Sequence, residues 1–258
     1  MTAYAEFQRF VLAFVLCALR VGTAMALLPA MSSALIGGVV RRMVTLAFAF
    51  LILPVAMDWM PPGELHMGLL CVIGLKEVVI GAIIGFVASI PFTIAENVGD
   101  FIDNQRGATM GELFSPLSGT QVSVLGTFFT QLVAVIFYAG GAVAVFLAVV
   151  YMSYDVLPLF GGVSVASNTP EVALGLLDTM TERTFMISAP IVIIMLLATI
   201  GLGFVNRTAP QLNVFFLSMP IKSALGLAIL AIYLQFVIRE LMYTEEGAIF
   251  GPVLQLLR

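Results

Sequence analysis

Five or six long runs of apolar residues, separated by short polar segments, make up most of this sequence. A run of about 20 apolar residues is long enough to cross a bilayer as a helix. Hydrophobic residues are 61% of the 258 residues, and charged residues are only 10%. An average soluble domain has about 25% charged residues, and the mean hydropathy here is +1.11. The sequence therefore predicts an all-α integral membrane protein.

The apolar runs define the expected helices. They lie at residues 10–28, 43–57, 64–90, 122–152, 184–205 and 214–237. The second run is short for a full span. Pro91 is expected to end or kink the third helix, and Gly140-Gly141 interrupt the fourth. A polar connection follows at 153–182, with a short amphipathic helix expected at 171–183.

Close helix packing is predicted at Gly81 and Gly85. Their small-xxx-small spacing lets two helix backbones approach closely. Cys17 and Cys71 lie inside apolar runs, where two thiols form no disulfide framework. Both are expected to be small buried hydrophobic residues.

Charged residues within or beside the apolar runs need partners, because a charge at mid-bilayer costs about 2.5–3.5 kcal/mol on insertion scales. They are Arg20, Lys76, Glu77, Arg183 and Lys222. Lys76 and Glu77 belong either to an ion or proton path or to internal ion pairs; for Arg20 and Lys222 a structural role is favoured. Successive helix positions point about 100° apart, so Lys76 and Glu77 are not expected to pair, and Arg20 is a candidate partner for Glu77.

The most polar stretch of the chain is 96–109. It holds three acids, one Arg, two Asn, one Gln and two Gly. Lipid cannot satisfy these groups, so the stretch is expected to contact water or protein. The next loop, 106–121, mixes Gly, Ser, Thr and Pro with apolar residues. It is either a solvated connection or a plug whose apolar side chains close a pore.

Enzyme chemistry finds no support in the sequence. It lacks a P-loop and a Gly-x-Ser-x-Gly elbow, and His66 is its only histidine. No basic patch suggests nucleic acid. We therefore expect a non-enzyme with no catalytic, cofactor-binding or metal site and no nucleic-acid partner.

Four motifs occur in order along most of the chain. They are KEVVIGAIIGF at 76–86, DNQRGAT at 103–109, SPLSG at 115–119 and APQLN at 209–213. Together they resemble the T component (SctT) of type III secretion export gates, a family similar to flagellar FliR. The DNQRGAT motif is the most specific, and the sequence looks like the injectisome branch more than the flagellar branch.

The resemblance implies a subunit of a protein-conducting gate in the bacterial inner membrane, within the type III secretion basal body. Kinked helical hairpins would pack into a heteromeric helical complex with several copies of the R and S subunits and with the U switch protein. The gate would pass unfolded inner rod, needle and effector proteins, and the subunit would also contact membrane lipid. An R-like part would span 1–152, a connection 153–183, and an S-like hairpin and tail 184–258.

The resemblance also singles out residues. Residues 106–121 would form the plug, with Arg106, Gly107, Met110, Leu113, Phe114, Leu117 and Gly119 in gating positions. Packing, inter-subunit or buried-charge positions would be Arg20, Lys76, Glu77, Asp103, Gln105, Pro210, Gln211, Asn213 and Lys222. The alternatives are an ion-coupled secondary transporter with Arg20, Lys76 and Glu77 as its relay, a flagellar homologue, or a scaffold that only nucleates assembly.

Overall fold

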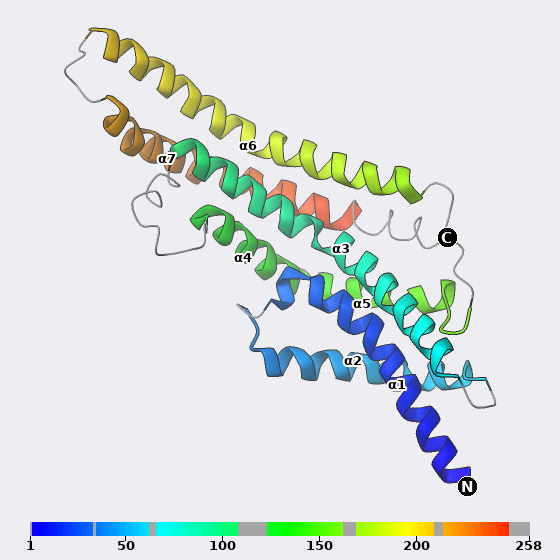
Figure 1. The fold of residues 1–258 in the computed structure, drawn as a ribbon. Helices are drawn as coiled ribbons and strands as arrows, with labels where there is room; N and C mark the ends of the chain where they lie inside the picture. The colour runs from blue at the N-terminus through cyan, green and yellow to red at the C-terminus, as the bar shows by residue number, and fades with distance from the viewer. Residues whose placement is uncertain are drawn as a thin grey trace. The chain divides into compact units, whose positions relative to one another are not determined.

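The computed structural model of the chain describes residues 2–32, 35–61, 66–107, 123–161, 169–208 and 214–247, and these ranges contain helices and no strand. The elements are α1 (Thr2–Leu27), the short 3-10 helix η1 (Pro29–Met31), α2 (Gly38–Asp58), α3 (Met67–Arg106), α4 (Val124–Ala139), α5 (Ala142–Val156), α6 (Thr169–Thr208) and α7 (Val214–Gly247) (Figure 1). The predicted all-α class is confirmed.

Among the described residues, five helices are long and apolar enough to cross a membrane: α1, α2, α3, α6 and α7. Helices α4 and α5 have 16 and 15 residues and are bent by 76° at Gly140-Gly141. Gly141 has φ +78°, a conformation that only glycine adopts readily. Each of the two helices is shorter than the roughly 20 residues of a full span. The pair is therefore either one broken span or a re-entrant hairpin.

Two helices extend beyond the apolar runs that predicted them, and of the two alternatives for Pro91, an end or a kink, the end of the helix is wrong. Pro91 lies inside α3, which runs on to Arg106. A proline removes one backbone hydrogen bond, and the packing of the following turns keeps the helix continuous. The second apolar run, predicted to be short, becomes a 21-residue helix because residues 38–42 join it.

The expected break before residue 184 is also absent, since α6 is one helix of 40 residues. Residues 171–183 are polar enough to suggest a separate helix, but no Gly or Pro occurs between Gly175 and Pro190 to break the helix near residue 184. The last helix, expected to end at Val237, continues as α7 to Gly247. Tertiary packing extends both helices beyond the apolar runs that predicted them.

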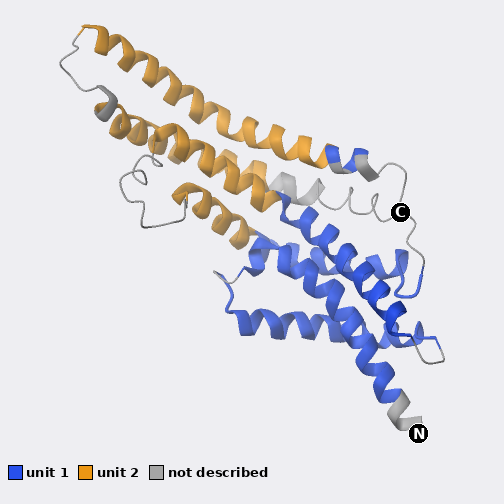
Figure 2. Cartoon of the chain, viewed as in Figure 1, with its two compact units in different colours: residues 1–90, 137–174, 247–258 blue, residues 91–136, 175–246 orange. Residues whose placement is uncertain are grey.

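Two compact units can be distinguished within the chain (Figure 2). Unit 1 contains residues 1–90, 137–174 and 247–258, and unit 2 contains residues 91–136 and 175–246. These boundaries are based on contacts in space. The division into 1–152, 153–183 and 184–258 comes from the family resemblance and stays a prediction.

In unit 1, α3 packs against α1 at the two glycines that predict a close approach. A Cβ atom on Gly81 would lie closer than 3.0 Å to the Arg20 carbonyl oxygen, and one on Gly85 would lie 2.6 Å from the Ala24 carbonyl oxygen. Real Cβ atoms essentially never come so close, so only glycine fits at either position. The small-xxx-small prediction is confirmed. The prediction for the cysteines holds for Cys17 but is wrong for Cys71, which is exposed.

Candidate functional site

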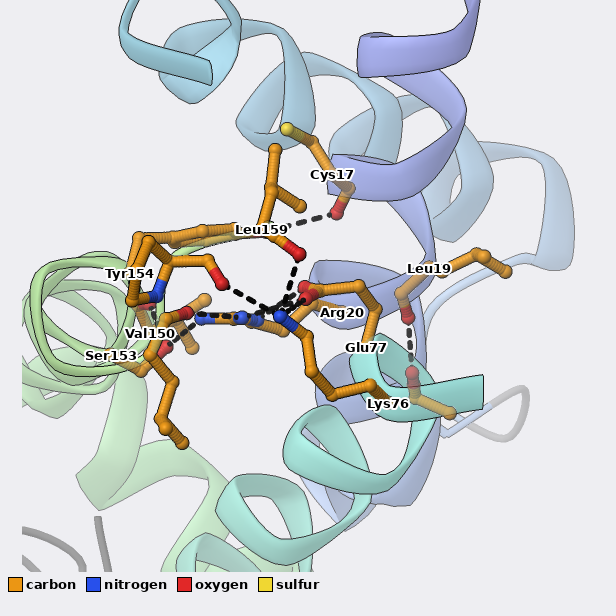
Figure 3. A network of polar contacts seen from close by, with 12 residues as sticks. Cys17, Leu19, Arg20, Lys76, Glu77, Val150, Ser153, Tyr154 and Leu159 are labelled. Atoms are coloured by element: carbon orange, nitrogen blue, oxygen red, sulfur yellow. Dashed lines mark hydrogen bonds and ion pairs between the residues drawn. The ribbon is translucent and has the colours of Figure 1, made fainter. Parts of the chain in front are cut away.

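The guanidinium of Arg20 lies at the centre of a buried network in unit 1 (Figure 3). Its Nε donates to Oε2 of Glu77 at 2.6 Å, and its Nη2 donates to Oε1 at 2.9 Å. Nη1 donates to Ser153 Oγ at 3.0 Å, and Nη2 also donates to the Leu157 carbonyl at 2.8 Å. The guanidinium carbon is 3.9 Å from the centre of the Tyr154 ring. The two-pronged Arg20–Glu77 pair joins α1 to α3, and the bond to Ser153 adds α5. The predicted pairing of Arg20 with Glu77 is confirmed.

Lys76 adds a second cation to this network. Its Nζ donates to the carbonyl oxygens of Pro158 at 2.6 Å and Leu159 at 2.7 Å, with Gly161 at 3.4 Å. Nζ is also 3.4 Å from Oε1 of Glu77, so the prediction that these neighbours do not pair is wrong. Their Cβ atoms point in different directions, but the long, flexible lysine side chain bends back to the carboxylate.

The Arg20 network, formed by Arg20, Lys76 and Glu77 with the partners above, has two cations and one carboxylate. The side chains of Arg20 and Glu77 are completely buried. Carbonyl groups at and beyond the end of α5 compensate the remaining positive charge, as expected at the negative end of a helix dipole. Each side-chain nitrogen and oxygen of Arg20 and Glu77 has a hydrogen-bond partner. Of the two interpretations of these charges, the geometry supports the structural one.

A second buried carboxylate, Asp103, lies near the end of α3 in unit 2 and is 1% exposed. Its Oδ1 accepts from Arg106 Nε at 2.7 Å. Its Oδ2 accepts from Ser123 Oγ at 2.8 Å and from the backbone N–H of Leu125 at 3.0 Å. One side chain thus holds the last residue of α3 and the start of α4. In the sequence, residues 108–122 connect these two points.

The residues at the start of α4 bind and stabilise this carboxylate. Ser123 caps the helix, because its Oγ accepts from the N–H of Gly126 at 2.8 Å while its hydroxyl donates to Asp103. A negative charge is also favourable at the positive end of a helix dipole. The backbones of α3 and α4 touch one turn away, where a Cβ on Gly99 would fall within 3.0 Å of the Gly126 Cα. The carboxylate and the glycine pair therefore fix α3 against α4.

Arg106 and Gly107 end α3. Arg106 Nη1 donates to Ser223 Oγ of α7 over a long 3.4 Å, and the Arg106 side chain is 13% exposed. Gly107 has φ +79°, the left-handed conformation with which many helices end. Its N–H donates to the Asn104 carbonyl at 3.2 Å.

The remaining predicted residues fall into two groups. Gln105 and Lys222 are half-buried on α3 and α7. The others lie outside the described residues, and they are Met110, Leu113, Phe114, Leu117, Gly119, Pro210, Gln211 and Asn213.

The sequence did not point us to Ser153 or Ser123 as partners of the buried charges. Ser123 could have been found, because a serine directly before an apolar helix is a typical N-cap. Ser153 could not, because it lies 133 residues from Arg20 and no local pattern links the two.

A groove of about 370 Å³ lies between α3 and α6 in unit 2, and Asn97, Asp100 and Asn104 are among its lining residues. Phe101 and Phe185 meet edge-on beside these residues, with ring centres 5.4 Å apart. Lipid cannot satisfy such polar groups, so the groove suits contact with water or protein. Within the part of the chain that the structure describes, no three His, Cys, Asp or Glu side chains are placed to hold a metal ion.

These features define a membrane protein with several spanning helices, whose buried charges fasten its own helices together. Residues 11–245 match the family described as bacterial export proteins, family 1. The chain belongs to this family.

Individual relatives narrow the assignment. The chain is 36% identical over 234 residues to "Yop proteins translocation protein T" of Yersinia pestis, which covers 88% of this chain and 87% of the relative. It is 34% identical over 224 residues to "Secretion system apparatus protein SsaT" of Salmonella typhimurium, covering 85% and 86%. Identity to "Flagellar biosynthetic protein FliR" of Caulobacter vibrioides is 26% over 235 residues, covering 91% and 92%.

The predicted resemblance is confirmed, and the flagellar proteins are the more distant relatives. The chain is a subunit of a type III secretion export apparatus, and its apolar helices fit a place in the inner membrane. The family assignment favours this function over the alternative of an ion-coupled secondary transporter.

Proposed function

We propose that this subunit forms and seals, with neighbouring subunits, the channel through which unfolded proteins cross the inner membrane. Residues 106–121 are the sealing segment in this proposal, and Arg106, Gly107, Met110, Leu113, Phe114, Leu117 and Gly119 are its gating residues. The subunit works by holding and closing a passage, without catalysing a reaction.

The observation that carries the proposal is that both ends of this stretch bind one buried carboxylate. Asp103 accepts from Arg106 on the α3 side and from Ser123 and Leu125 on the α4 side. An element that seals a passage and yields to a passing chain has to be attached to helices that stay in place. The contacts of Asp103 and the close packing at Gly99 give both attachment points such a base.

The proposed partners are several copies of the R and S subunits, the U switch protein, and inner rod, needle and other secreted proteins in transit. The short, bent helices α4 and α5 support such partners, because neither helix is long enough to cross the membrane alone. The R-like part (1–152), the connection (153–183), the S-like part (184–258) and the inter-subunit placing of Pro210, Gln211 and Asn213 belong to the same proposal.

Deletion of residues 107–119 tests the sealing role in the complete secretion apparatus. We expect the apparatus to assemble, because the described helices keep their contacts, and the inner membrane to leak ions and small molecules. The measurement is ion conductance or dye entry in cells that contain the assembled apparatus. A membrane as tight as that of the wild type would contradict the proposal.

A matched variant keeps the length of the chain and removes only the apolar side chains of the segment. It carries Ser at Met110, Leu113, Phe114 and Leu117. A seal made by apolar contacts should leak in this variant too, although less than in the deletion. A tight membrane in this variant would show that apolar side chains of the segment do not make the seal.

A further inference from the structure

A second groove in unit 2, of about 560 Å³, is lined by residues of α6 and α7. Charged side chains line one part of it, and apolar side chains line the other. We propose that this groove binds one glycerophospholipid whose headgroup carries both a phosphate and a primary ammonium, as phosphatidylethanolamine does. The inference depends on the place of α6 and α7 in the membrane and is independent of the proposed sealing role.

The level of the groove in the membrane follows from α6. Residues 184–205 contain no Asp, Glu, Lys or Arg; Arg183 directly precedes this stretch and Arg207 closely follows it. At about 1.5 Å per residue, the stretch is about 33 Å long, which matches a hydrocarbon core of about 30 Å. Arg183 therefore lies at a boundary between the hydrocarbon core and the lipid headgroups.

Helix α7 reaches the same boundary. Arg183 forms an ion pair with Glu240 of α7, so the two helices are in contact at this level. Residues 223–238 of α7 contain no charged side chain. The uncharged stretch follows Arg183 in α6 and precedes Glu240 in α7, so the two helices run antiparallel here. The ion pair thus marks the headgroup level on both helices.

The lining of the groove changes from polar to apolar at this level. One face of α6, with i, i+3, i+4 and i+7 spacing, carries Thr179, Glu182, Arg183 and Met186. Met186 and Phe236 line the groove on the side of the uncharged stretches. They are 61% and 48% exposed in the part of the chain that the structure describes. Charged residues at headgroup level and apolar residues at acyl-chain level fit a phospholipid.

The charges in the groove select the headgroup. Arg183 is the one cation among the lining residues that the structure describes, and its side chain is 40% exposed. A guanidinium has five N–H donors, so Arg183 can bind a lipid phosphate while it holds Glu240. The exposed carboxylate of Glu182 can accept from a primary ammonium, which donates hydrogen bonds that a quaternary ammonium lacks. Two carboxylates and one guanidinium disfavour a headgroup that carries only negative charge.

The experiment counts the lipids that remain bound to the purified complex of this chain with its neighbouring subunits, by native mass spectrometry. The complex in detergent is titrated with phosphatidylethanolamine or with phosphatidylglycerol of the same acyl chains. Arg183→Met should retain one phosphatidylethanolamine fewer per copy of this chain. We expect its affinity at this site to fall about tenfold, because a charge-assisted hydrogen bond to the phosphate is lost.

Glu182→Gln tests the choice of headgroup. It should weaken the binding of phosphatidylethanolamine by about fivefold and reduce the preference over phosphatidylglycerol, because the ammonium loses a charged partner. Asp178→Asn is the matched control, since it removes an exposed carboxylate from the same helix outside the groove. It should bind both lipids as the wild type does. If Arg183→Met does not assemble, Glu182→Gln decides the question.

Three results would overturn the inference. The first is an equal count of bound phosphatidylethanolamine in the wild type, Arg183→Met and Glu182→Gln. The second is equal affinity of the wild type for both lipids, which would indicate binding through acyl chains alone. The third is loss of a neighbouring subunit from Arg183→Met with an unchanged lipid count, which would show that a protein occupies the groove. Leakage of the 107–119 deletion tests the proposed function separately.

Discussion

Glu77 in unit 1 and Asp103 in unit 2 are both buried carboxylates on α3, but their partners differ in number and in position along the chain. Glu77 is bound by Arg20 from α1 and by Lys76, and these cations also bind carbonyl groups at and beyond the end of α5. Asp103 is bound by one cation, Arg106, three residues away on its own helix. Its second oxygen holds the start of the next helix.

The difference indicates two kinds of role. The Arg20 network joins helices that are far apart in the sequence, and the Arg20–Glu77 pair has no contact with solvent. Such a pair holds a fold in one state, because separating it would leave two unpaired charges in the interior. Asp103 joins the two ends of a short stretch of chain, and its partner Arg106 is partly exposed. We therefore assign the first network to the stability of unit 1, and the second to fixing the end of α3 against the start of α4.

The largest predicted effect is at Arg20. Arg20→Ala leaves Glu77 buried without its two-pronged partner and should destabilise unit 1 by about 3–5 kcal/mol. Thermal unfolding of the purified complex in detergent measures this loss of stability. Replacing both Arg20 and Glu77 by Met should recover much of the loss, because no unpaired carboxylate remains. A single variant as stable as the wild type would show that the pair does not hold α1 to α3.

A second prediction compares the two close helix contacts. Gly85→Ala in unit 1 and Gly99→Ala in unit 2 both push a methyl group into backbone, which should destabilise each by about 1–3 kcal/mol. The matched control is Gly201→Ala in α6, where no neighbouring atom lies within 4 Å. The control should be neutral or slightly stabilising, since alanine favours helix. Equal stability of the three variants would contradict the packing described here.

A smaller effect is expected at the start of α4. Ser123→Ala removes the helix cap and one donor to Asp103, and should destabilise unit 2 by about 0.5–2 kcal/mol. Ser123→Thr keeps the hydroxyl and serves as the control. Thermal unfolding of the two variants, compared in one detergent, gives the difference. An alanine variant as stable as the threonine variant would mean that Ser123 is not a cap.

The smallest effect is expected for the ion pair between Arg183 of α6 and Glu240 of α7. Its side chains are 40% and 24% exposed, so solvent weakens the attraction. Arg183→Met should change stability by about 0–1 kcal/mol. A loss as large as that of Arg20→Ala would show that exposure does not separate strong from weak pairs in this protein.

Much of this fold could be predicted because hydropathy and local spacing determine it. The spanning helices follow from the apolar runs, and the contact at Gly81 and Gly85 follows from the size of glycine. Arg20 could be assigned to Glu77 because a buried charge needs an opposite one. Each of these inferences follows from the residue types alone, through their hydropathy, size or charge.

The rest depends on which distant parts of the chain meet. The carbonyl groups that bind Lys76 are more than 80 residues away. Every residue has a backbone carbonyl, so the sequence does not show which ones accept from Lys76. The two donors to Asp103 from the start of α4 lie beyond a stretch of polar and apolar residues with no clear period. The continuity of α6 past Arg183 is likewise decided by packing. The roles of Met110, Leu113, Phe114 and Leu117 stay predictions.

Ion conductance of the assembled apparatus, measured side by side for Glu77→Gln and for the deletion of residues 107–119, tests the proposed sealing role most directly. We expect Glu77→Gln to lower the thermal stability and the yield of the complex, while the complexes that do assemble stay tight. We expect the deletion to assemble in near-normal yield and to leak. Equal leakage from both variants, or leakage from Glu77→Gln alone, would contradict the sealing role proposed for residues 106–121.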